Sequence, residues 1–238
     1  MRQIIALGGG GFSMEPDHPF LDDYILQQAN MANPKICFLP TASGDSAGYI
    51  ERFYNAFESK PCTTSHLSLF KPPTRDLRSF ILEKDVVYVG GGNTVNMLLL
   101  WKHWGLDKIL KEAYEQGTIL TGLSAGSICW FEEGITDSYG AGLEPINGLG
   151  FLSGSHAPHY DGEHERRPTF HRLINEKRIK HGIAADDGVG LHYQNGSLTT
   201  IIKSRKDAHA YSVQINHGDI EEKQLESTYL GNKRKKSS

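Results

Sequence analysis

Short apolar runs that alternate with helical patterns are the feature that most constrains the fold of this chain. Five runs in the first half have the length and composition of buried strands, at 3–7, 35–39, 64–69, 85–89 and 118–122. Between them, apolar residues recur at helical spacing, as in Ile50, Phe53, Tyr54 and Phe57, and again in Leu106, Ile109, Leu110 and Ala113. This alternation predicts βαβ units and therefore a mostly parallel sheet with helices on both faces.

The pattern changes from about residue 180 to β-rich pieces separated by turn signals such as Asn195-Gly196. We interpret these pieces as further strands and an antiparallel hairpin at an edge of the same sheet. The 238 residues suit one α/β domain, which we expect to span 1–230. A basic tail follows over 231–238, and its KRKK run at 233–236 is typical of a solvated chain end.

Charge and cysteine content exclude several classes of protein. The 25 Lys and Arg residues nearly balance the 28 Asp and Glu residues, so the net charge of −3 favours neither nucleic acid nor a membrane as partner. The apolar run at the N-terminus is too short for a signal peptide. Three cysteines without CxxC spacing argue against a disulfide framework and fit a cytoplasmic protein; they are Cys37, Cys62 and Cys129.

The segment GLSAG at 122–126 matches the pattern G-x-S-x-G, in which a serine sits on a sharp turn between a strand and a helix. The flanking glycines avoid crowding in that turn, and the amides at the start of the following helix face any charge that develops beside the serine. The predicted strand before Ser124 and the predicted helix after it favour a nucleophile. An ordinary helix-capping serine is the alternative.

A second glycine turn, VGGGNT at 89–94, also follows a predicted strand and precedes a helical pattern. Sites in parallel sheets gather at the carboxyl ends of strands, so the two turns can face one crevice. The main-chain amides of Gly92 and Ala125 could then form an oxyanion hole. Neither this turn nor the GGGGFS segment at 8–13 completes a nucleotide-binding motif.

A serine nucleophile needs a base, and the segment GSHAPHYDGEHERRP at 154–168 places three histidines among carboxylates. Their spacing matches no zinc motif, so no metal site is expected. Asp186 and Asp187, before a glycine, and Asp137 are candidates for the acid that orients the histidine. These residue types supply a Ser, His, Asp constellation, but spacing alone does not choose among the histidines.

Taken in order, VGGGNTVNML, GLSAG, APHYDG and ADDGVGL resemble the peptidase E and cyanophycinase family of serine peptidases, family S51. The resemblance extends from the first glycine turn to about residue 195. It implies a three-layer αβα sandwich with a mostly parallel sheet, similar to class I glutamine amidotransferase domains. It also implies hydrolysis of peptide bonds through an acyl-enzyme, without a cofactor.

The resemblance assigns roles residue by residue. Ser124 matches the nucleophile and His159 the base, while Asp187 falls where related members carry Glu. Because Asp is one methylene shorter, Asp187 reaches His159 only if the backbone is closer or if Asp186 contributes. Asp137 resembles a second acid of the peptidase E branch and is the other candidate for orienting the base.

Substrate specificity is a further expectation from the resemblance. Peptidase E is similar to exopeptidases selective for N-terminal aspartate, and an arginine beyond the base reads the carboxylate in that branch. The candidates for binding a small peptide substrate here are Arg166, Arg167 and, beside the glycine turn, Asn93; a solvated charge cluster is the alternative for the two arginines. A homodimer is compatible with the sequence, which does not fix the oligomeric state.

Three other functions use the same parts. A carboxylesterase or amidase would share the elbow and prefer p-nitrophenyl esters to peptides. A glutaminase is disfavoured because the elbow carries serine, while Cys129 lies inside the predicted helix. A non-catalytic protein that binds a small molecule would leave Ser124 unreactive.

Overall fold

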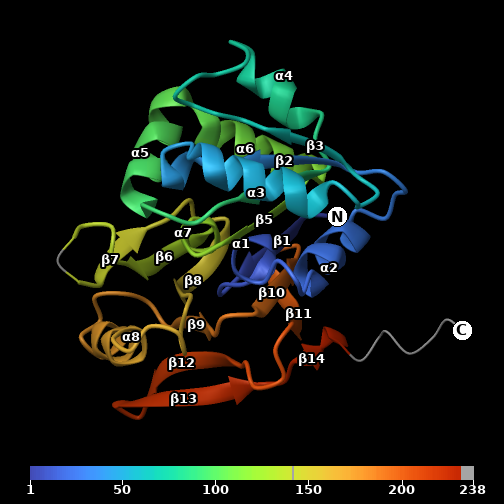
Figure 1. The fold of residues 1–238 in the computed structure, drawn as a ribbon. Coiled ribbons are helices and arrows are strands. Elements are labelled where there is room, and N and C mark those ends of the chain that lie inside the picture. Colours follow the sequence, from blue (N-terminus) through green and yellow to red (C-terminus); the bar gives the residue numbers. More distant parts are fainter. Residues whose placement is uncertain (141, 232–238) are drawn as a thin grey trace, which may run out of the picture.

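The computed structural model describes residues 1–140 and 142–231, which form two β-sheets with helices packed around them (Figure 1). The first sheet has eight strands in the order β14-β11-β10-β1-β5-β4-β2-β3. Their bounds are β1 Gln3–Leu7, β2 Lys35–Leu39, β3 Thr63–His66, β4 Val86–Val89, β5 Ile119–Leu123, β10 Val189–Gln194, β11 Ser197–Lys203 and β14 Thr228–Tyr229. Strands β1, β5, β4, β2 and β3 run parallel, so their carboxyl ends share one edge.

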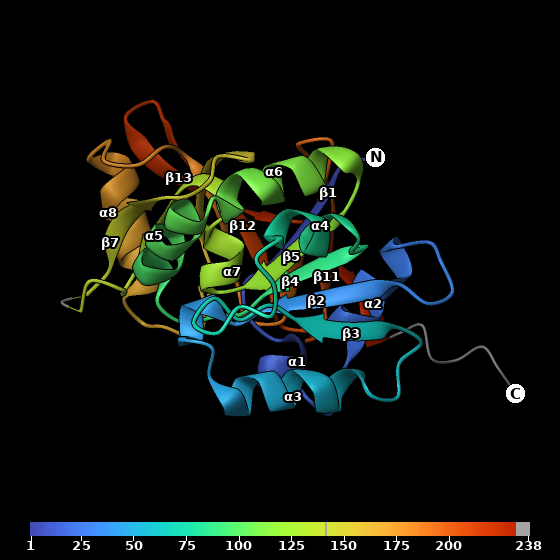
Figure 2. The ribbon, with the colours of Figure 1, turned by 90° about the horizontal axis from the view of Figure 1, so that it is seen from above.

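Helices cover both faces of the first sheet, as Figure 2 shows from above. One face packs against α1 (Gly11–Met14), α2 (Phe20–Gln28) and α3 (Ala47–Phe57), and the other against α4 (Leu77–Leu82), α5 (Thr94–Trp104), α6 (Leu106–Gln116) and α7 (Ala125–Ile128). A short 3-10 turn spans Thr41–Ser43. The arrangement confirms the predicted αβα sandwich, and β1 and β5 are buried throughout, as strands covered on both faces must be.

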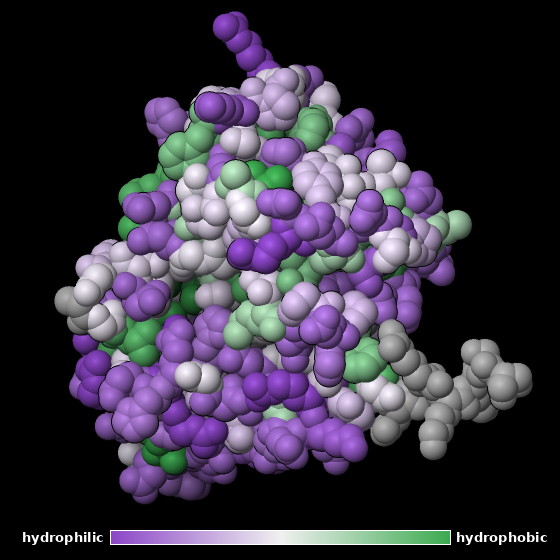
Figure 3. All heavy atoms as spheres, viewed as in Figure 1, coloured by the Kyte–Doolittle hydropathy of each residue, from purple (hydrophilic) through white to green (hydrophobic). Residues whose placement is uncertain are grey.

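Aromatic packing holds α3 to the sheet. The stripe at helical spacing buries Phe53 and Phe57, and Phe53 stacks on Phe38 of β2 with ring centroids 4.9 Å apart. Phe12 of α1 meets Phe38 edge to face at 5.4 Å. Full burial of each such ring stabilises the fold by roughly 1.5–3 kcal/mol. The apolar side chains thus lie inside, and the face drawn in Figure 3 is mostly hydrophilic with small apolar areas.

The second sheet was not predicted. It has six strands in the order β13-β12-β9-β8-β6-β7 and carries α8 (Arg166–Asn175). Its strands are β6 Phe131–Thr136, β7 Glu144–Asn147, β8 Leu152–Ala157, β9 Gly182–Ala185, β12 Ala210–Asn216 and β13 Asp219–Leu225. The expectation that all strands after residue 180 lie at an edge of the first sheet is therefore wrong for β9, β12 and β13.

The β10–β11 hairpin does extend the first sheet, antiparallel to β1, and its turn has positive φ at both Asn195 and Gly196, as Asn-Gly hairpin turns require. The chain passes from one sheet to the other within Asp186–Gly188. Strands of four to seven residues carry too little pattern to specify which free edge they join, so the sequence alone could not separate the two sheets.

The KRKK run at 233–236, which was predicted to belong to a solvated chain end, lies outside the described residues. Among the helices of the described part, none is long and apolar enough to cross a bilayer.

One buried carboxyl on α2 gives a test of the packing. Burial raises the pKa of Asp22 to about 7, although nearby Lys60 acts against the shift. In the unfolded chain this carboxyl ionises near pH 4. Between about pH 4 and 7 the folded protein therefore binds one proton more than the unfolded chain, and the free energy of unfolding falls as pH rises through that window. We therefore expect the melting temperature of Asp22→Asn, relative to that of the wild type, to be higher at pH 8.5 than at pH 5.

Thermal unfolding at the two pH values measures this effect, and Asp17→Asn, on the exposed turn before α2, is the control. A melting-temperature difference between Asp22→Asn and the wild type that stays constant with pH would contradict the assignment.

Candidate active site

Ser124 occupies a strained turn at the carboxyl end of β5, directly before α7. Its backbone has φ 56° and ψ −118°, a left-handed conformation that is rare for a residue other than glycine. The flanking glycines are required by contact with β4. A Cβ at Gly122 would lie 2.5 Å from the carbonyl oxygen of Gly126, and one at Gly126 would overlap the carbonyl oxygen of Val89. The pattern G-x-S-x-G therefore lets this turn pack closely on its neighbouring strand.

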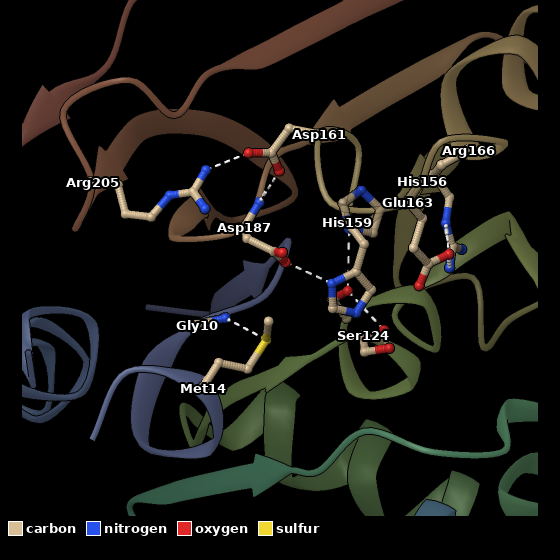
Figure 4. A network of polar contacts seen from close by, with 11 residues as sticks. Gly10, Met14, Ser124, His156, His159, Asp161, Glu163, Arg166, Asp187 and Arg205 are labelled. Carbon is tan, nitrogen blue, oxygen red and sulfur yellow. Dashed lines mark hydrogen bonds and ion pairs between the residues drawn. The ribbon is translucent and has the colours of Figure 1, made fainter. Parts of the chain in front are cut away.

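His159 follows β8 and also has a positive φ, 53°. Its main-chain N–H donates to the carbonyl oxygen of Gly8, 2.9 Å away, which ties the loop of the second sheet to the end of β1. Nδ1 lies 2.6 Å from Oδ1 of Asp187, and the ring lies between Asp187 and Ser124 (Figure 4). Because Nδ1 faces the carboxylate, Nε2 is on the side of the ring toward the serine. The three predicted residues are thus brought together from β5, β8 and β9.

Two glycines allow the short Asp187 side chain to reach the imidazole. A Cβ at Gly9 would overlap Oδ1 of Asp187, and a Cβ at Gly162 would lie 2.5 Å from Oδ2. The backbone therefore approaches the carboxylate from two sides, which compensates for the missing methylene. The main-chain N–H of Asp187 donates to Oδ1 of Asp161 at 2.9 Å, and Asp161 in turn pairs with Arg205.

The other two candidate acids lie elsewhere. Asp186 is buried and accepts a hydrogen bond from the main-chain N–H of His209 at 2.8 Å, so it fastens β9 to the start of β12. Burial raises the pKa of Asp186 to about 6. Asp137 is exposed beyond β6 and lines the cavity in front of Ser124. Of the three candidate acids, Asp187 is therefore the one whose carboxylate contacts His159 in the described structure.

A cavity of about 390 Å³ opens beside the serine. It is lined by residues from both sheets: Gly92, Asn93, Ser124, Asp137, Ser138, Gly140, Glu163 and Arg166. Its volume is at the lower end of the range for ligand pockets, which suits a small ligand. The glycine turn predicted to face Ser124 contributes Gly92, whose φ of 135° and close approach to the carbonyl of Ala42 exclude a side chain.

Asn93 lines this cavity, and its side chain already has two partners. Its Oδ1 accepts from the N–H of Asn96 at 2.8 Å, which caps α5, and its Nδ2 donates to the carbonyl oxygen of Ser138 at 3.0 Å. Asn93 therefore fixes the position of the segment that carries Asp137.

The two candidate arginines point to different places. Arg166 lines the cavity, but only 3% of the residue is exposed, and its guanidinium donates to Glu163 and to the carbonyl oxygen of Ile135. Arg167 pairs with Glu222 at 2.9 Å and lies over the rings of Tyr160 and Tyr211 at 4.6 Å. Arg167 is absent from the described lining of the cavity.

A second histidine supports the elbow from inside the protein. His156 is fully buried, stacks on Phe131 and donates from Nδ1 to the carbonyl oxygen of Ile183 at 2.8 Å. Burial lowers the pKa of His156 to about 4, so the ring is neutral near pH 7. Oγ of Ser127 lies 3.2 Å from Nε2 of this ring and 2.8 Å from the carbonyl oxygen of Ser124.

Other reactive groups do not enter the site. Cys129 is buried at the end of α7, and burial raises the pKa of its thiol well above the ordinary value. Across residues 1–140 and 142–231, no cluster of His, Cys, Asp or Glu is arranged to hold a metal ion.

Sequence reasoning missed three kinds of residue here: the glycines against Asp187, the Asp161–Arg205 pair and Glu163. The spacing of Glu163 and Arg166 is a usable signal, because residues three apart face each other near a helix start. Nothing local marks Gly9 or Gly162, since their partner is distant in sequence.

Sequence and structure comparisons identify proteins to which this chain is similar. A sequence model of peptidase family S51 matches residues 4–201. The chain is 58% identical over 231 residues to the uncharacterized peptidase YgaJ of Bacillus subtilis strain 168, covering 97% of this chain and 100% of the relative. It is 26% identical over 142 residues to the uncharacterized peptidase Lmo0363 of Listeria monocytogenes, covering 56% and 69% of the two chains.

The crystal structure of a peptidase from an acI-B1 Actinobacterium has the same fold, with a TM-score of 0.72 over 95% of each chain at 15% identity. Four sequence motifs in one order, a strained serine turn and a family match over most of the chain lead to one conclusion: the chain belongs to peptidase family S51.

Proposed function

We propose that this protein is a serine peptidase that hydrolyses short peptides through an acyl-enzyme, with Ser124, His159 and Asp187 as its catalytic triad. One observation carries the proposal. The His159 ring lies between a strained serine and a carboxylate 2.6 Å from Nδ1, which is the arrangement that activates a hydroxyl nucleophile.

In the proposed mechanism, Nε2 of His159 takes the hydroxyl proton as Ser124 Oγ attacks the peptide carbonyl. Asp187 holds the imidazole in the required tautomer and stabilises the imidazolium. The amides of Gly92 and Ala125 stabilise the oxyanion, a contribution that is typically worth about 10²–10³ in turnover for each donor. His159 then protonates the leaving amine, and water attacks the ester with His159 as base.

Mass-spectrometric mapping of a fluorophosphonate adduct tests the proposed pair. We expect an adduct on Ser124 in the wild type and at least a hundredfold slower labelling in His159→Ala, because the base no longer removes the proton. An unlabelled wild type would instead favour a non-catalytic small-molecule binding protein. Faster turnover of p-nitrophenyl esters than of any peptide would favour an esterase.

The contact between Gly9 and Asp187 gives a second test. A methyl group at Gly9 overlaps Oδ1 of Asp187, so Gly9→Ala must displace the carboxylate from His159. We expect kcat to fall about a hundredfold or more while the fold is retained. Gly48→Ala is the matched control, because a Cβ there meets no atom within 4 Å. Equal activity of the two variants would refute the role of Asp187.

Selectivity for N-terminal aspartate, which the peptidase E branch implies, requires a free arginine. The guanidinium of Arg166 already donates to Glu163 and Ile135, and Arg167 pairs with Glu222. We therefore expect kcat/KM for Asp-Leu to be no higher than for Ala-Leu. A strong preference for Asp-Leu would show that substrate displaces Glu163 from Arg166.

A further inference from the structure

A chain of polar contacts leads away from His159 through the main chain of the proposed catalytic acid (Figure 4). Oδ1 of Asp161 accepts a hydrogen bond from the main-chain N–H of Asp187 at 2.9 Å. Oδ2 of Asp161 accepts a hydrogen bond from Nη2 of Arg205. One carboxylate thus uses both of its oxygens to join the residue that contacts His159 to an arginine that follows β11.

The arginine is held in place by the segment that it contacts. The main-chain N–H of Ser204 donates to the carbonyl oxygen of Gly188 at 2.8 Å. A Cβ at Gly188 would lie 3.0 Å from Cγ of Arg205, so the apolar stem of the arginine lies on the residue directly after Asp187. Its guanidinium reaches Asp161 in the loop after β8, and the pair therefore connects the two sheets.

The segment that carries Asp161 contacts Asp187 twice. Asp161 binds the main chain of Asp187, and the next residue, Gly162, lies so close that a Cβ there would be 2.5 Å from Oδ2 of the same residue. Loss of the first contact would release the segment that supports the carboxylate. Asp161 is therefore placed to fix Asp187 relative to His159.

Arg205 also acts on this site through its charge. Burial lowers the pKa of the Arg205 guanidinium, but its hydrogen bond to Asp161 and the charges of Asp161, Asp187 and Glu15 outweigh burial and raise that pKa above the ordinary value. The guanidinium is thus close enough to interact with the carboxylate that contacts the imidazole of His159.

The other charged groups described around His159 are mostly paired, buried or neutral. They are the ion pairs Glu163–Arg166 and Glu222–Arg167, the neutral ring of His156, the buried Asp186 bound to the N–H of His209, and the exposed Asp137. Loss of the Arg205 guanidinium would therefore add an unbalanced negative charge, that of Asp161, beside Asp187. Added negative charge stabilises the imidazolium, so His159 would remain protonated, and unable to act as a base, up to a higher pH.

Building on the proposed peptidase activity, we propose that Asp161 and Arg205 are positioning residues of the catalytic triad. Asp161 holds Asp187 against His159 through the main chain. Arg205 balances the charge of Asp161, so that the imidazole loses its proton at a lower pH than it would beside an unpaired Asp161.

Two variants with opposite changes of charge test this role. Arg205→Met keeps the apolar stem and removes the positive charge, whereas Asp161→Asn keeps an oxygen for the N–H of Asp187 and removes the negative charge. NMR titration without substrate gives the pH at which the His159 ring is half protonated, and loss of the signal in His159→Gln assigns it. We expect Arg205→Met to raise this pH by about half a unit, Asp161→Asn to lower it by a similar amount, and the double variant to resemble the wild type.

The controls separate charge from structure. Arg205→Lys keeps the charge and should titrate close to the wild type. Arg178→Met removes an arginine of similar exposure, 46% against 42% of the side chain, from an ion pair with Glu144, and should leave the titration unchanged. Because ion pairs with this exposure stabilise a fold only slightly, these variants should remain folded. Shifts of the same sign in Arg205→Met and Asp161→Asn, or shifts no larger than that of Arg178→Met, would overturn the role of the charges.

Asp161→Ala tests the positioning role, because it removes the acceptor as well as the charge. Relative to Asp161→Asn, we expect the proton on Nδ1 of His159 to exchange with water about tenfold faster, as measured by NMR, and fluorophosphonate to label Ser124 about tenfold more slowly. Equal exchange rates in Asp161→Ala and Asp161→Asn would overturn this part of the proposal.

The two proposals fail in different ways. Opposite titration shifts in a protein that resists fluorophosphonate and cleaves no peptide would retain the roles of Asp161 and Arg205 toward His159 and exclude the peptidase. Labelling of Ser124 that depends on His159, without opposite titration shifts, would retain the peptidase and exclude the charge balance by Arg205.

Discussion

The close approach of the Asp187 carboxylate to His159 is the contact on which the rest of the site depends. It exists because Gly9 and Gly162 bring main chain against both carboxylate oxygens, where any side chain would collide. Hydrogen bonds from His159 N to Gly8 O and from Gly188 N to Gly9 O join the same segments. The end of β1 in the first sheet is thereby fixed against the loops after β8 and β9 in the second. The two sheets contribute different parts: the serine comes from one, and the histidine and acid come from the other.

Much of this arrangement could be predicted from sequence. The glycine-flanked serine between an apolar strand and a helix predicted the elbow, because the pattern G-x-S-x-G marks this turn within five residues. The contact of both glycines with Val89 of β4 became evident only in the structure. The helical stripe around Phe53 likewise specified α3. The second sheet could not be predicted, because strands such as β9 are short and their partners lie far along the chain. Spacing alone did not separate Asp187 from Asp186, because adjacent carboxyls look equivalent in sequence. The family resemblance pointed to Asp187, and the contact between its Oδ1 and Nδ1 of His159 agrees with that assignment.

The contacts of Arg166 and Arg167 explain why these two arginines, which follow His159 in the sequence, are not free to bind a substrate carboxylate. Arg166 lines the cavity, but Glu163 and the Ile135 carbonyl take up its donors, while Arg167 lies on two tyrosines and pairs with Glu222. A buried guanidinium without such partners would be costly, so these contacts also stabilise the start of α8. Below the elbow, the neutral His156 and Ser127 serve a comparable purpose, because they give the strained serine turn a polar support inside an otherwise apolar layer.

The claim that Asp187, and not its neighbour, completes the catalytic unit is tested most directly by the rate at which fluorophosphonate labels Ser124 in Asp187→Asn and in Asp186→Asn. The geometry predicts that Asp187→Asn slows labelling by up to roughly 10⁴, since the wrong imidazole tautomer then faces the serine. Asp186→Asn should label at nearly the wild-type rate, because that carboxyl binds His209 N at 2.8 Å and not His159. Equal loss in the two variants, or a greater loss in Asp186→Asn, would contradict the account.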